Sequence, residues 1–164
     1  MLPDLAIEPE ISASSTRFWI PIGAALFIVA LTVSALVVPQ LRLLHFLQAL
    51  IYVAVVILAR RNSMWGFGAG VTIAVIWNSL QLFVTHLVQA GAVALWHFLS
   101  AGQVRRVDTM MVTLGCIGHF ILIFACLAAS VEDQGTDRKW WKFAGGGAIA
   151  VAYFALIVAV ALPR

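Results

Sequence analysis

The stretch FWIPIGAALFIVALTVSALVVPQLRLLHFLQALIYVAVVILAR, residues 18–60, contains two long apolar runs joined by one short break. The runs cover residues 18–38 and 41–60, and only Pro39 and Gln40 separate them. An α-helix needs about 20 apolar residues to cross the hydrocarbon core of a bilayer. Because proline interrupts a helix, the pattern predicts two membrane-spanning helices joined in a tight hairpin.

The rest of the chain repeats this pattern in three further apolar runs, at 65–90, 107–130 and 142–162. Hydrophobic residues make up 63% of the 164 residues and charged residues only 10%, whereas a soluble domain carries roughly a quarter charged residues. All the charged residues lie at the ends of the runs or between them. We therefore expect an all-α, polytopic transmembrane helix bundle of about five spans. A short polar tail, 1–16, would precede one transmembrane domain, 17–164.

The third run is longer than a bilayer requires, because apolar residues continue past Gly91 as far as residue 100. A single helix over 65–99 would be about 52 Å long, compared with a hydrocarbon core of about 30 Å. We therefore expect a break near Gly91, followed by a short interfacial helix near 92–100 that contains Trp96 and His97.

The flanking residues indicate where the protein lies. Tryptophans occur near the ends of the runs, as in an aromatic belt at the lipid head groups. If the N-terminus is cytoplasmic, six basic residues lie inside and four outside, which favours that orientation. We expect an integral protein of the bacterial inner (plasma) membrane. The basic residues are not interleaved with aromatic residues, so they suit anionic lipid head groups and not nucleic acid.

Small residues indicate where helices can approach closely. Gly66 and Gly70 form a G-x-x-x-G pair in the third run. In the last run, five alanines share one helical face beside the glycines 145–147, and they are Ala144, Ala148, Ala152, Ala155 and Ala159. We expect these faces to contact a neighbouring helix, in this chain or in another subunit.

Polar side chains interrupt the third run in a helical pattern. At 100° per residue, Asn78, Gln81, Thr85 and Gln89 fall within about 80° of one another on one face. An amide facing lipid would lack hydrogen-bond partners, so this face should point into the bundle. Its side chains could hold helices in register or line a path for a small solute.

A second polar stripe, His45, Gln48 and Tyr52, lies in the second run. With a break near Gly91, His45 and His86 lie at similar depths and could together hold a haem iron, with Gln48 orienting one of the rings. If the third helix instead covers 76–98, His86 moves to the middle of the membrane and cannot pair with His45. His119 of the fourth run would then lie at the depth of His86 and be its partner. Without iron, the same groups could bind a quinone head group, with a histidine or Tyr52 donating to its carbonyl oxygens.

The layout of five apolar runs with several histidines is similar to that of the single-chain cytochrome b anchors of succinate and fumarate oxidoreductases. The similarity concerns the number of spans and the histidine content, and it implies haem b as a cofactor. The first run carries no histidine and no specific motif matches, so no family is assigned from the sequence.

Other classes of function find less support. Away from the ends of the runs, no acidic or basic residue other than histidine occurs in them, which argues against most ion-coupled pumps. Hydrolytic motifs are absent from the sequence, and the longest loop, 131–141, is too short for a catalytic domain. We therefore expect no catalytic activity of its own and an accessory or anchor subunit of a larger membrane complex, or a homo-oligomer. The alternatives are an electron-transfer protein that binds haem b or quinone, and a small-solute carrier or channel lined by the stripe of the third run.

Overall fold

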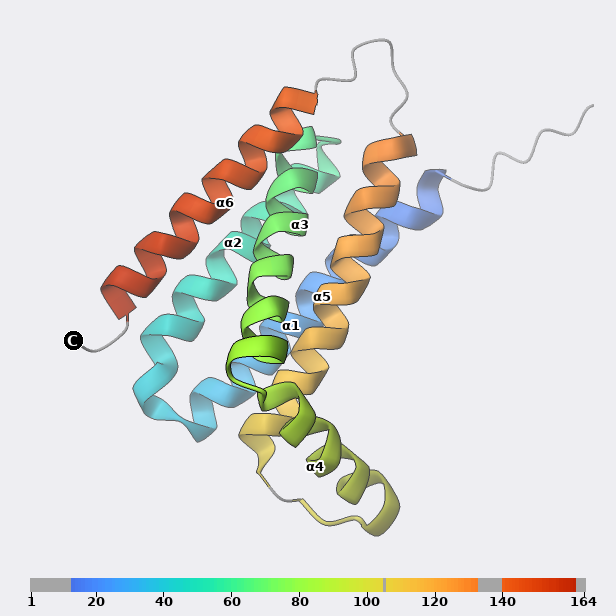
Figure 1. Ribbon diagram of the computed structural model, residues 1–164. Coiled ribbons are helices and arrows are strands. Elements are labelled where there is room, and N and C mark those ends of the chain that lie inside the picture. The colour runs from blue at the N-terminus through green and yellow to red at the C-terminus, as the bar shows by residue number, and fades with distance from the viewer. Residues whose placement is uncertain (1–12, 105, 133–139, 162–164) are drawn as a thin grey trace, which may run out of the picture.

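The computed structural model describes residues 13–104, 106–132 and 140–161, and the backbone of these segments is almost entirely helical. The long elements are α1 (Ala13–Val37), α2 (Arg42–Arg60), α3 (Met64–Ser79), α4 (Leu87–Ala101), α5 (Val107–Glu132) and α6 (Trp140–Ala161) (Figure 1). A 3-10 turn, Pro39–Leu41, precedes α2, and a π-helical turn, Leu80–Val84, extends α3. Residues 1–12 of the expected tail lie outside the described residues, and α1 begins within the remainder of that tail.

Five of these helical segments are long and apolar enough to cross a membrane. They are Thr16–Val37, Pro39–Arg60, Met64–Val84, Val107–Glu132 and Trp140–Ala161. The prediction of an all-α bundle with five spans is therefore confirmed, and the protein is an integral membrane protein. The expected tight hairpin is also present: the Leu41 amide donates to the Val38 carbonyl at 3.0 Å, and the Arg42 Nε donates to the Ala35 carbonyl at 3.1 Å.

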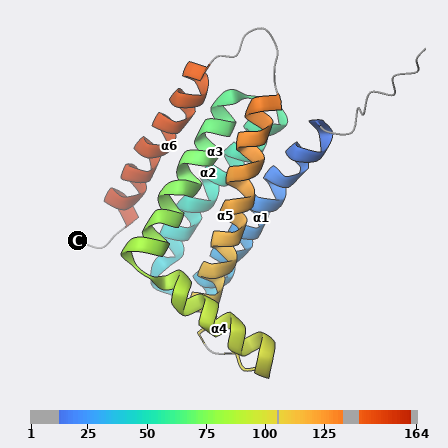
Figure 2. The ribbon, with the colours of Figure 1, turned by 45° about the vertical axis from the view of Figure 1, so that its right-hand side comes forward.

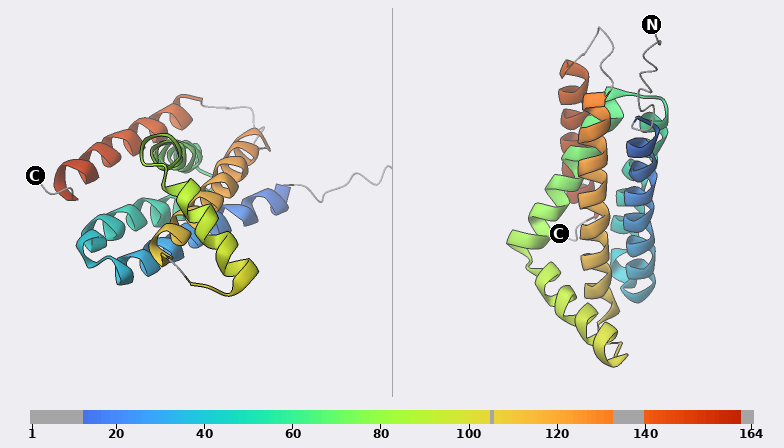
Figure 3. Two further views of the ribbon diagram at one scale, coloured as in Figure 1. Left: turned by 60° about the horizontal axis from the view of Figure 1, so that its bottom comes forward. Right: turned by 90° about the vertical axis from the view of Figure 1, so that its right-hand side faces the viewer.

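The five long helices lie side by side, and α4 leaves the bundle at an angle (Figures 1 and 2). Helix α3 packs against α2, α5 and α6, while α5 packs against α1, α3 and α4. The right-hand view of Figure 3 shows α4 projecting beyond the end of the bundle at which α1 meets α2. The two helices α3 and α5 therefore connect all the others.

Glycines permit the closest helix contacts. A β-carbon added to Gly23 of α1 would lie 2.7 Å from the Gly118 carbonyl oxygen, and one added to Gly118 would lie 2.8 Å from the Gly23 carbonyl oxygen. Between α3 and α6, a β-carbon on Gly68 would overlap the Phe143 carbonyl. The two backbones thus touch directly at both places, which adds many small dispersion contacts in a setting where lipid supplies no hydrophobic drive.

The two small-residue faces have different surroundings. Gly66 and Gly70 both lie in close contact, with Leu58 of α2 and with Cys126 of α5 respectively, so that prediction is confirmed. In α6, Gly146 and Gly147 face α3 and are buried. The five alanines of α6 are all exposed, so they contact no neighbouring helix closely among the described segments.

The break in the third run lies earlier than expected. The chain leaves α3 through the π-helical turn Leu80–Val84, and His86 then adopts a left-handed conformation with φ of 53°. Gly91, the expected break, lies inside α4, where a β-carbon would overlap the carbonyl oxygen of Thr109. Gly91 therefore serves the packing of α4 on α5, and the expected separate short helix is α4, Leu87–Ala101.

We predict that Gly68→Ala lowers the stability of the protein by about 1–3 kcal/mol, the usual cost of adding a methyl group to a filled contact. Thermal unfolding in mild detergent would measure this. Val75→Ile adds the same single carbon to an exposed position of the same helix, and it should leave the melting temperature unchanged. Equal melting temperatures for the wild type and Gly68→Ala would show that α3 and α6 are not in direct backbone contact.

Candidate ligand-binding site

A hydrogen-bonded cluster surrounds His119 at the middle of the bundle. The Tyr52 hydroxyl of α2 lies 2.6 Å from Nε2 of His119, and the Asn78 Oδ1 of α3 lies 2.8 Å from its Nδ1. Cys116, one turn earlier on α5, donates from Sγ to the same Asn78 oxygen at 2.9 Å. All four side chains are buried, so three helices meet through polar contacts that water does not reach.

These contacts define the tautomer of His119. The Asn78 carbonyl oxygen can only accept, so Nδ1 of His119 carries the proton and donates it. Nε2 then has a lone pair and accepts the hydrogen bond from Tyr52. Phe27 of α1 stacks on the imidazole, with ring centroids 3.9 Å apart. His119 of α5 is thus held by contacts from α1, α2 and α3, and both of its ring nitrogens are engaged.

A cavity of about 260 Å³ lies beside this cluster. Its lining comes from α1, α2, the α3 end with the π-helical turn, the start of α4, and α5; it includes Ser34, His45, Gln48, Trp77, Gln81, Asp108, Thr109, Cys116 and His119. Along α5 the lining extends from Asp108 to His119, a rise of about 16 Å. A water molecule needs only about 10–15 Å³ of such space, so the cavity is far larger than a packing defect.

Several buried polar atoms of the lining residues lack a hydrogen-bond partner among the residues that the structure describes. They are Nδ1 of His45, Oε1 of Gln48 and Nε1 of Trp77. Nδ2 of Asn78, next to the cavity in the His119 cluster, is a fourth. A buried polar group without a partner costs about 1–3 kcal/mol, so four together indicate that something else satisfies them.

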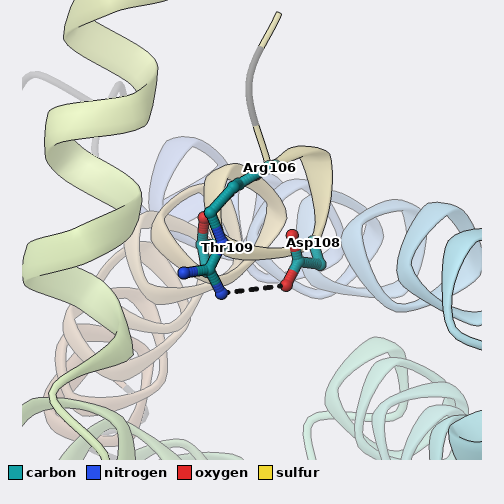
Figure 4. Close-up of polar contacts among 3 residues, drawn as sticks. All are labelled: Arg106, Asp108 and Thr109. Atoms are coloured by element: carbon teal, nitrogen blue, oxygen red, sulfur yellow. Dashed lines mark hydrogen bonds and ion pairs between the residues drawn. The ribbon is translucent and has the colours of Figure 1, made fainter.

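Asp108 lies at the end of the cavity near the α4–α5 connection. Its Oδ2 lies 3.6 Å from an Nη of Arg106 (Figure 4), and the Thr109 hydroxyl donates to the Arg106 carbonyl at 2.9 Å. The side chain of Arg106 is 66% exposed and that of Asp108 is 36% exposed. Such an exposed pair contributes at most about 1 kcal/mol. Asp108 thus places an acidic group in the cavity lining, and Arg106, which lies outside the lining, pairs with it.

The structure brings together part of the cofactor-binding set expected from the sequence. His45, Gln48 and His119 line the same cavity, while Tyr52 lies behind His119 and is fully buried. His86 is exposed at the break after the π-helical turn and is outside the cavity lining. The pairing of His45 with His86 around a haem iron stays a prediction. Within the described residues, no three His, Cys, Asp or Glu side chains form a metal-binding group.

The polar stripe of the third run divides into two parts. Asn78 is buried and Gln81 lines the cavity, whereas Thr85 and Gln89 are exposed. The Thr85 hydroxyl lies 3.0 Å from Oε1 of Gln81, and the Gln89 amide donates to the Leu82 carbonyl at 3.1 Å. The wider π-helical turn and the left-handed His86 shift the helical phase, so the four side chains do not share one surface.

The sequence pointed to His119 of α5, but the other side chains that α5 and α1 contribute were missed. Thr109, Cys116 and His119 recur at spacings of seven and three, which places them on one helical face. The same wheel analysis that identified the stripes at 45–52 and 78–89 would have found this third one. Phe27 gave no signal, because an aromatic residue in an apolar run is usual.

No family model, curated protein or solved structure gives a match to this chain. Its function therefore has to be argued from the cavity and the surfaces themselves.

We predict an energetic coupling between Tyr52 and His119. A double-mutant cycle with Tyr52→Phe and His119→Phe should give a coupling free energy of about 0.6 kcal/mol and at most about 1.7 kcal/mol, the average and the maximum found for hydrogen bonds between helices of a membrane protein. Unfolding in mixed micelles would measure it. Tyr153→Phe with His119→Phe is the control cycle, because Tyr153 donates instead to the Leu47 carbonyl. Additive effects in both cycles would contradict the assigned cluster.

Proposed function

We propose that this protein binds a small planar ligand of the quinone class inside the membrane, and that it acts in electron transfer. The observation that supports this proposal is the set of unpartnered polar atoms on side chains that line one intramembrane cavity. His45 and Trp77 carry ring nitrogens that can donate to a quinone carbonyl, and Gln48 has an oxygen that can accept from a quinol hydroxyl.

The shape and apolar surface of the cavity support the same ligand class. Ligand pockets for drug-sized molecules are typically about 300–1,000 Å³, so 260 Å³ suits a single-ring head group. The aromatic rings of Phe27 and Trp77 offer surfaces for stacking. Leu41, Leu44 and Val112 supply an apolar lining toward the mouth, along which an isoprenoid tail could leave the cavity.

Quinone fits the described side chains better than haem b does. An iron held between two histidines needs one free ring nitrogen from each. In this cavity both nitrogens of His119 already have partners, and only His45 has an unbonded ring nitrogen. A quinone needs only hydrogen-bond donors and acceptors, which the cavity offers on α2 and α3.

We predict that short-chain ubiquinone or menaquinone analogues bind to the purified protein and that His45→Leu weakens this binding by about two- to tenfold. That is the effect of losing one hydrogen bond. Isothermal titration calorimetry in mild detergent would measure the affinity. His97→Leu is the matched control, because His97 is exposed on α4 and lies outside the cavity lining.

Two results would contradict the quinone proposal. One is an affinity unaffected by His45→Leu and by the double variant His45→Leu, Gln48→Leu. The other is a sharp α-band in the dithionite-reduced minus oxidised spectrum of the protein purified in mild detergent, since that would identify bound haem.

A second candidate function, an accessory or anchor subunit of a larger membrane complex, is favoured by α6. Its five alanines form an exposed face of small side chains along the helix, and such faces allow close helix packing. Helix α6 is also the least buried of the five apolar spans. The partner could be another subunit or a second copy of this chain.

We predict for this second candidate that the protein extracted from its native membrane has a mass well above 17.8 kDa after correction for detergent. Ala148→Leu with Ala152→Leu should lower that mass to the monomer value, because the added side chains separate the helices. Light scattering coupled to size-exclusion chromatography would measure it. A monomer before substitution would count against the subunit role while leaving the quinone proposal intact.

A further inference from the structure

A second depression lies on the outer surface of the bundle, in the groove between α1 and α5. It has a volume of about 480 Å³. Thr16 and Trp19 of α1 line it, together with residues of α5 between Ile117 and Ala128. Apart from the Thr16 hydroxyl, these side chains are apolar, and Phe120 and Phe124 are exposed. The groove is separate from the cavity discussed above and faces the surrounding lipid.

The length of the groove matches one leaflet of a bilayer. From Ile117 to Ala128 an α-helix rises about 16 Å, and half of the hydrocarbon core is about 15 Å. The groove occupies the half of the bundle in which α1 begins and α5 ends (Figure 1). Trp19, 47% exposed, lies near that end, as expected for an aromatic residue at the head-group level. A lipid acyl chain of this leaflet would therefore fill the groove from the interface to the midplane.

Two charged residues of opposite sign, Arg17 and Glu132, lie next to Thr16 at one end of the groove, outside its lining. The Thr16 hydroxyl hydrogen-bonds to Oε1 of Glu132, the last residue of α5. The other carboxylate oxygen of Glu132 and Nε of Arg17 are buried, and neither has a hydrogen-bond partner among the described residues. Arg17 and Glu132 also form no ion pair with each other within 4.0 Å. Both side chains are half-buried, so each charge loses part of its hydration without gaining a partner, and this end is suited to a ligand with both charges.

We propose that this groove binds one phospholipid whose head group carries an amine beside its phosphate, as in phosphatidylethanolamine. The ammonium group would donate to the free oxygen of Glu132, the phosphate would accept from Arg17, and one acyl chain would lie along α5. An anionic lipid without an amine would satisfy Arg17 but would place no cation beside Glu132. The head group is thus selected by charge complementarity, independently of what the inner cavity binds.

Native mass spectrometry tests this proposal on the full-length protein in nanodiscs of equal parts palmitoyl-oleoyl phosphatidylethanolamine and phosphatidylglycerol. We expect the wild type to retain one bound lipid after the protein is released from the nanodisc, and to retain the ethanolamine lipid in preference to the glycerol lipid. Glu132→Gln should reduce that preference by about two- to fivefold, as for one partly exposed charge pair. Arg17→Gln should lower retention of both lipids, because both carry a phosphate.

Groove-filling variants separate the acyl-chain site from the head-group site. Ala128→Phe should abolish retention of both lipids, and Val75→Phe, at an exposed position of α3, should have no effect. If Ala128→Phe does not fold, Ala128→Leu gives the same comparison with less added volume. Unchanged retention in a folded groove variant would overturn the groove as the site. The head-group assignment would be overturned if Glu132→Gln kept the wild-type preference for the ethanolamine lipid. A wild-type dimer whose interface excludes lipid would overturn it as well.

Discussion

A buried imidazole or amide side chain in this bundle needs a hydrogen-bond partner outside its own helix, because the surrounding hydrocarbon offers none. His119 shows how far this constraint determines the arrangement. One ring nitrogen is bonded to Tyr52 of α2 and the other to Asn78 of α3. A rotation of α5 by one residue would remove both bonds and leave three buried polar groups without partners. The cluster therefore sets the rotation of α2, α3 and α5 relative to one another, which apolar packing alone would leave poorly specified.

Glycine contacts set the distances between helices, and the cavity occupies the place where such contacts end. Gly23 and Gly118 bring α1 and α5 into direct contact just beyond the level of Phe27 and His119. Toward the other end, α3 turns away through its π-helical turn. Fully buried apolar residues, among them Ile20, Val55 and Leu122, close the bundle beyond the cluster. The cavity is thus closed at its inner end, which suits a binding site better than a continuous channel.

The sequence was sufficient to predict the fold because long apolar runs have few alternatives in a membrane. It predicted the hairpin at Pro39 for the same reason. The sequence was less informative about the break near residue 86. A glycine such as Gly91 suggests a break by its residue type alone, whereas no residue type marks a π-helical turn or a left-handed histidine. That one difference separated Thr85 and Gln89 from Asn78 and Gln81. The site was predicted only in part because His45 and Gln48 belong to a stripe visible within one helix, whereas the cavity depends on how five helices meet.

Helix α5 explains why the inner cavity and the outer groove coexist in so small a protein. Its first half, from Asp108 to His119, presents polar side chains to the interior. Its second half, from Ile117 to Ala128, presents aromatic and aliphatic side chains to the lipid. Gly115 and Gly118 lie at the crossing point, against Phe27 and Gly23 of α1. Because α1 contacts α5 along this whole length, a ligand in the cavity and a lipid in the groove would both press on the same pair of helices. Occupancy of one site could alter affinity at the other only through a displacement of α1 against α5, and the direct glycine contact leaves little room for such a displacement. We therefore expect the two sites to act independently.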